Sequence, residues 1–89
     1  MASGPDATST DAEVTIRYWA SARAAAGCDS EPFSGSSVGE VLQAAASAHA
    51  ALGGVLAIST ILLDGRPVGA GVRLSAGTTL EVLPPFAGG

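Results

Sequence analysis

The stretch "SVGEVLQAAASAHAAL", residues 37–52, has the most regular pattern in the chain and predicts its main helix. Ser37 and Glu40 have the spacing of a capping box, in which each side chain accepts a hydrogen bond from a backbone N–H near the helix start. An apolar stripe at helical period follows and is expected to face the core. Its members are Val38, Val41, Leu42, Ala45, Ala48 and Leu52. The glycine pair at 53–54 is expected to end the helix.

Two alternating stretches, one on either side of this helix, predict strands with one buried face. The first is "EVTIRYW", residues 13–19, and the second is "TTLEVLP", residues 78–84. Counting by twos along each stretch separates an inward from an outward set of side chains. The expected inward residues are Val14, Ile16, Tyr18, Leu80 and Val82.

Three further elements complete the expected layout. "ASARAAAG", residues 20–27, is alanine-dense and predicts a short helix that stops at its glycine. Residues 28–35 predict a short strand, which Pro32 confines to a sheet edge. "ISTILLDGRPV", residues 58–68, predicts a hairpin around a type I′ turn at Asp64-Gly65. The resulting prediction is an α+β fold, a mixed open sheet packed on one main helix.

Length and composition predict one small domain of 89 residues. We expect a disordered N-terminal extension at 1–12, the folded domain at 13–83 and a flexible tail at 84–89. The chain has a net charge of −4 and no lysine, which argues against nucleic-acid or anionic-membrane partners. It has no signal-peptide pattern and no apolar run near the length of a membrane span, so we expect a cytoplasmic protein.

The sequence assigns no functional role to its single cysteine or its single histidine. Cys28 cannot form an internal disulfide, so a reducing compartment is the simpler interpretation, and its position after a helix stop is taken as incidental. His49 lies beside the apolar stripe and is interpreted as a flanking residue. Since a lone histidine cannot build a metal site, we expect none.

The chain ends in "LPPFAGG", residues 83–89, a segment that suits neither a core nor a helix. Pro84 and Pro85 end any ladder pairing and stiffen the start of the tail. Gly88 and Gly89 have no Cβ, so they permit close approach of the terminal carboxylate to a partner's active site. A terminal glycine pair by itself is most simply a frayed end. The residues around it decide whether it is a frayed end or a reactive arm.

Four stretches supply that context, because together they resemble one known family. They are "VTIRYWASARAAAG" at 14–27, "SVGEVL" at 37–42, "LLDGRPV" at 62–68 and "LEVLPPFAGG" at 80–89. The pattern resembles the MoaD/ThiS family of sulfur carriers, which have the β-grasp fold of ubiquitin, and is most similar to the MoaD branch, the small subunits of molybdopterin synthase. The terminal motif is the specific part of the likeness.

The resemblance implies a function for the tail. An E1-like enzyme of the MoeB type would adenylate the carboxylate of Gly89 with ATP, and a sulfur donor would convert the product to a thiocarboxylate. A large subunit of the MoaE type would then use that sulfur to make molybdopterin. The carrier would be a non-catalytic subunit with no bound cofactor, since its partner enzymes supply the catalytic groups.

Strand parity also predicts a docking surface. Trp19 and Leu83 fall on the outward faces of the first and last strands, which are parallel neighbours in a β-grasp sheet. An exposed apolar patch where the tail departs usually marks an interaction site. The expected partner-binding residues are Trp19, Leu83, Pro84, Pro85 and Phe86, with Arg23 added by the resemblance alone. The same parity places Arg17 and Glu81 close enough to pair across the strands.

Other functions stay open at this stage. The chain could carry sulfur for another product, such as thiamin, cysteine or a thio-metabolite. It could be a ubiquitin-like protein modifier, although without lysine it cannot form chains linked through its own side-chain amines. It could also be a binding module whose tail has no chemistry.

Overall fold

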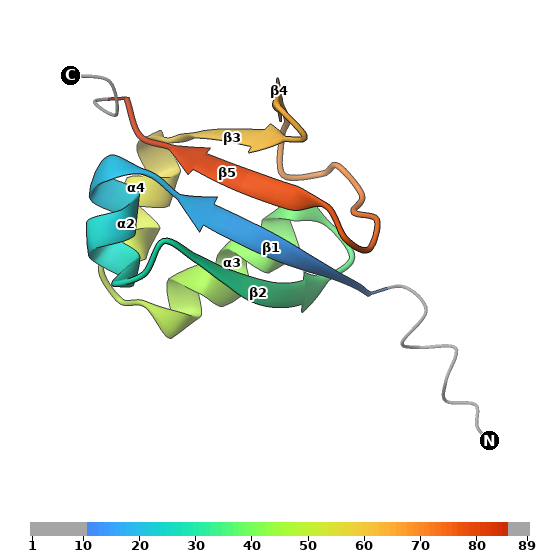
Figure 1. Cartoon of the computed structure of the whole chain (residues 1–89), viewed down its shortest axis with the longest axis horizontal. Helices are drawn as coiled ribbons and strands as arrows, with labels where there is room; N and C mark the ends of the chain where they lie inside the picture. The colour runs from blue at the N-terminus through green and yellow to red at the C-terminus, as the bar shows by residue number, and fades with distance from the viewer. Residues whose placement is uncertain (1–10, 86–89) are drawn as a thin grey trace.

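A computed structural model describes residues 11–85 of the protein (Figure 1). Residues 1–10 and 86–89, which include most of the predicted extension and tail, lie outside the described residues. The elements are β1 (Ala12–Tyr18), α2 (Ala20–Ala26), β2 (Ser30–Gly35), α3 (Val38–Ala48), α4 (Leu52–Ile58), β3 (Thr60–Leu63), β4 (Arg66–Pro67) and β5 (Thr79–Leu83). None of the helices in this part of the chain is long and apolar enough to span a membrane.

The five strands form one open, mixed sheet in the order β2-β1-β5-β3-β4. β1 and β5 pair in parallel at its centre, and the other neighbouring strands pair antiparallel. β2 is an edge strand, as Pro32 predicted. β1 begins one residue before the predicted domain boundary, because Ala12 pairs with Gly35 and its side chain is buried.

The core lies between the helices and one face of the sheet (Figure 1). All five predicted inward strand residues are buried, so the predicted strand parity is confirmed. From the helices they are met by Ala22, Ala26, Val38, Val41, Ala45 and Leu52. Two members of the predicted stripe deviate: Leu42 is half-buried and Ala48 is exposed.

The main helix is shorter than predicted, and a second helix follows it. α3 ends at Ala48 because His49 adopts an extended conformation, with φ −133° and ψ 105°. Gly53 and Gly54 lie inside α4 and do not terminate a helix. The fully buried Leu52 anchors α4, and its burial outweighs the roughly 1 kcal/mol by which each glycine disfavours a helix.

The predicted turns are confirmed by their backbone angles. Asp64 and Gly65 have φ values of 52° and 85°, and a type I′ turn needs positive φ at both positions. Gly27 ends α2 in the left-handed conformation, with φ 77°. β3 begins at Thr60, two residues later than predicted, because 58 still belongs to α4.

The cap of α3 differs from the predicted capping box in one contact. The backbone N–H of Glu40 donates to the Ser37 hydroxyl at 3.3 Å, as predicted. The Glu40 carboxylate accepts instead from the backbone N–H and the hydroxyl of Ser36, at 2.8 and 2.9 Å. The backbone N–H of Ser36, followed by its hydroxyl, lowers the pKa of the Glu40 carboxyl.

We expect Ser37→Ala to lower the free energy of unfolding by about 1 kcal/mol, because one backbone N–H at the start of α3 loses its side-chain partner. Ser47→Ala is the matched control, since Ser47 is an exposed residue of the same helix and alanine is the better helix former. Urea denaturation of both variants measures the difference. A midpoint of Ser37→Ala equal to that of the parent protein would show that the Ser37 hydroxyl contributes nothing to the cap.

Candidate functional site

The parallel pairing of β1 and β5 brings Trp19 and Leu83 to the same end of the sheet, as the strand parity predicted. Tyr18 is the register partner of Val82, and the backbone N–H of Trp19 donates to the Val82 carbonyl at 3.3 Å. The side chain of Trp19 is 36% exposed, and that of Leu83 is half-buried. Both residues stand where the chain continues into the C-terminal segment.

Arg17 interacts with Trp19, and the predicted pairing with Glu81 is wrong. Arg17 and Glu81 are register partners, but the ion pairs among residues 11–85 are Arg23–Asp29 and Glu31–His49. The Arg17 guanidinium lies 4.7 Å from the centroid of the Trp19 ring. These two residues share a strand face two positions apart, so the cation–π contact needs no cross-strand reach.

The remaining predicted site residues differ in their exposure, and some lie outside the described residues. Pro84 is buried and so offers little surface to a partner, whereas Pro85 is exposed. Arg23 is exposed on α2 and forms a 3.5 Å ion pair with Asp29, a kind of surface pair that contributes little to stability. Phe86 and the predicted reactive residues at 88–89 lie outside the described residues.

The structure adds one apolar residue to this region that the sequence reasoning missed. Ile58 is 60% exposed at the end of α4. The next strand begins at Thr60, which pairs with Leu83, so Ile58 lies at the same end of the sheet. The sequence pattern at 58–68 predicts a hairpin, so it gives no signal for an exposed residue at the end of a helix. We call Trp19, Ile58, Leu83 and Pro85 the tail-end surface.

A comparison with known family models gives one match, to the ThiS family, over residues 16–89, which include the terminal glycines. The chain belongs to the ThiS family. A search of the curated proteins found no match.

Several solved structures are similar to this ThiS-family chain. Small archaeal modifier protein 1 of Methanosarcina acetivorans is 28% identical, with a TM-score of 0.80 over 89% of this chain and 98% of its own. Its namesake from Haloferax volcanii is 25% identical, with a TM-score of 0.77 over 86% and 99%. A protein named "Putative molybdopterin converting factor, subunit 1" from Pyrococcus furiosus is 25% identical, with a TM-score of 0.76 over 83% and 98%. These matches confirm the predicted β-grasp, ubiquitin-like fold.

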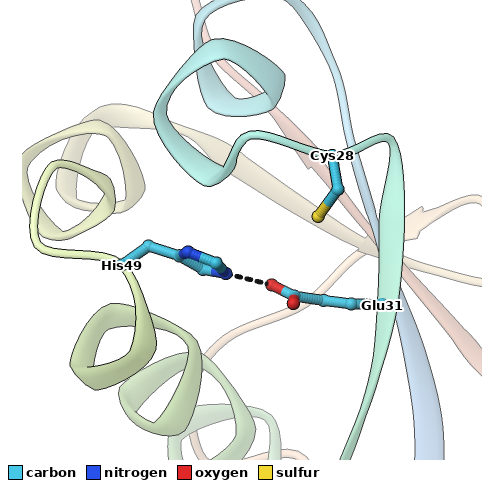
Figure 2. A group of neighbouring side chains, drawn as sticks. All are labelled: Cys28, Glu31 and His49. Atoms are coloured by element: carbon cyan, nitrogen blue, oxygen red, sulfur yellow. Dashed lines mark hydrogen bonds and ion pairs between the residues drawn. The ribbon is translucent and has the colours of Figure 1, made fainter.

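A second group of polar side chains in this ThiS-family protein was not expected from the sequence. Cys28 and His49, treated as incidental and as a helix flank, both lie beside Glu31 (Figure 2). The Oε2 atom of Glu31 accepts a hydrogen bond from the Tyr18 hydroxyl at 2.7 Å and lies 2.5 Å from Nε2 of His49. The group joins β1, β2, the turn after α2 and the residue that ends α3.

The charge of Glu31 affects the acidity of its neighbours. Burial, followed by the negative charge of Glu31, raises the pKa of the Cys28 thiol. Burial, followed by the hydrogen bond to Glu31, raises the pKa of the Tyr18 hydroxyl. The Cys28 thiol therefore lacks the lowered pKa of a catalytic cysteine.

Proposed function

We propose that this chain is a sulfur carrier whose C-terminal carboxylate becomes a thiocarboxylate and supplies sulfur for molybdopterin. The observation that carries the proposal is the extension of the ThiS family match through Gly89, the last residue. Its support from the fold is that β5 lies at the centre of the sheet, between β1 and β3. A central strand gives the segment that follows it a fixed point of departure.

The proposed chemistry starts on an E1-like enzyme of the MoeB type. The Gly89 carboxylate attacks the α-phosphate of ATP, so a carboxyl–phosphate bond forms and pyrophosphate leaves. A sulfur donor then displaces AMP and leaves a thiocarboxylate. The chain's own contribution is an unhindered carboxyl group, because glycine has no Cβ to block a narrow channel. ATP is bound by the activating enzyme, and we propose no cofactor for the carrier.

The second half of the proposal concerns delivery. Burial of Pro84 fixes the point from which the arm starts, and the five residues 85–89 would span about 17 Å if fully extended. The tail-end surface would dock on a large subunit of the MoaE type while the arm enters its active site. Because the cycle needs ATP and reduced sulfur, we place it in the cytoplasm.

The name of the Pyrococcus furiosus structure favours the molybdopterin pathway, and the two archaeal modifiers favour a second candidate function. As a modifier, the chain would form an isopeptide bond from Gly89 to a lysine of a target. Both candidates share the adenylation step. Delivery to thiamin or another thio-product would also begin with it.

Intact-mass measurement tests the proposal. After incubation with an E1-like enzyme, ATP and a sulfur donor, the protein should gain the mass difference between one sulfur and one oxygen atom. Oxidation of Met1 or Cys28 produces nearly the same gain, so fragmentation must place the change on the C-terminal segment. An unmodified C-terminus would overturn the carrier proposal. Covalent adducts with other proteins would favour the modifier, and co-purification with a MoaE-type subunit would favour molybdopterin.

A further inference from the structure

Three side chains with metal-binding donors meet on the side of the sheet that the helices cover (Figure 2). They come from segments well separated along the chain: Cys28 from the turn after α2, Glu31 from β2 and His49 from the end of α3. Their donor atoms all lie within 4.8 Å of one another. We propose that Cys28, Glu31 and His49 bind a divalent transition-metal ion of the Zn²⁺ type.

The donor set suits this class of ion. Thiolate and imidazole ligands select zinc and similar metals, whereas magnesium and calcium prefer sites built from oxygen alone. Three protein ligands leave a fourth tetrahedral position for water or another small ligand. The site therefore resembles open zinc sites more than the fully closed structural ones.

The donor atoms, which lie within 4.8 Å of one another, have to shift as the ion binds. With metal–ligand bonds of about 2.0–2.3 Å, donors in a tetrahedral zinc site are about 3.3–3.7 Å apart. Nε2 of His49 and Oε2 of Glu31, now 2.5 Å apart, would separate by about 1 Å as the ion replaces their hydrogen bond. Binding needs a Cys28 thiolate and an unprotonated Nε2 on His49, so the thiol proton is released to solvent as the metal–sulfur bond forms. Their side chains are 23% and 22% exposed, so an ion can reach them from solvent.

Tyr18 would orient the site. Its hydroxyl donates to Glu31, and its ring meets the His49 ring edge-on, with centroids 6.5 Å apart and planes at 87°. Tyr18 is fixed in the core at 2% exposure, so it positions both ligands without binding the ion. Hydrogen bonds to ligating carboxylates of this kind are a usual part of zinc sites.

The test is a titration of the untagged full-length protein with Zn²⁺ and with Co²⁺ as a spectroscopic probe. Because the chain has one cysteine and one histidine, a thiolate-to-cobalt charge-transfer band identifies Cys28 as a ligand. We expect that band, visible bands typical of tetrahedral cobalt, and displacement of cobalt by zinc. Sedimentation should show a monomer, and the cobalt titration should saturate at one ion per chain.

Variants decide whether the three residues act together. Cys28→Ser, Glu31→Gln and His49→Gln should each weaken Zn²⁺ binding by at least about tenfold, since loss even of an orienting partner costs about 10–100-fold. Asp64→Asn, which removes an exposed acid in the β3–β4 turn, is the control and should bind as the parent does. Thermal melts without metal must first show that each variant is folded, and Zn²⁺ should raise the melting temperature of the parent and control alone.

Three results would overturn the proposal. They are the absence of the charge-transfer band, equal Zn²⁺ affinity in parent and Cys28→Ser, and binding that occurs only between two copies of the chain. Equal affinity in parent and Cys28→Ser would mean that Cys28 is no ligand and that Glu31 and His49 form only a hydrogen bond with each other. None of these results bears on adenylation at Gly89, so the sulfur-carrier proposal is tested independently.

Discussion

Deletion of Gly88 and Gly89 is expected to abolish adenylation while leaving the melting temperature unchanged. The reacting group is the terminal carboxylate, and the activating enzyme must admit it through a channel that fits a backbone without side chains. Extension of the chain by one alanine after Gly89 should have the same effect, because it displaces the carboxylate. ATP–pyrophosphate exchange with the cognate E1-like enzyme measures the loss.

A matched pair of glycine substitutions separates this effect from a change in the fold. Gly88→Ala adds a methyl group to the proposed arm and should reduce exchange. Gly71→Ala adds the same group in the loop before β5, where a Cβ would meet nothing within 4 Å, and should change neither exchange nor stability. Undiminished exchange by the deletion variant would contradict the carrier proposal.

Trp19→Ala is expected to weaken binding to a MoaE-type partner by at least about 2 kcal/mol, roughly thirtyfold. Tryptophan buried at an interface often dominates its energetics, and Trp19 is the largest side chain of the tail-end surface. In the free protein its ring is 36% exposed and contacts the Arg17 guanidinium. The melting temperature should therefore change much less than the affinity. Calorimetric titration and thermal melts measure the two quantities.

Val72→Ala is the control for this prediction. Val72 is also 36% exposed, but its carbonyl accepts from Val38 at the start of α3, next to the end of the sheet where β1 begins. It lies away from the tail-end surface, so its removal should leave partner binding intact. If Trp19→Ala binds normally and melts far lower, Trp19 serves the core and the docking surface is wrongly placed.

The sequence alone determined the alternation of buried and exposed residues and the main turns. Val14, Ile16 and Tyr18 point inward because side chains alternate along a strand, and this holds whichever strand lies alongside. Asp64-Gly65 forms its turn because a short segment meets the backbone requirement by itself. The family match likewise rests on the order of residues, including the terminal glycines.

The tertiary structure decided which distant residues meet. Gly53 and Gly54 stay helical because a neighbouring leucine is buried, and Arg17 binds Trp19 although Glu81 is its register partner. The grouping of Cys28 with His49 depends on how β2 and α3 pack, which no local spacing specifies. Local sequence patterns show the repeat with which side chains face one side of a single helix or strand. Contacts between elements depend on register and packing, which arise only when the whole chain has folded.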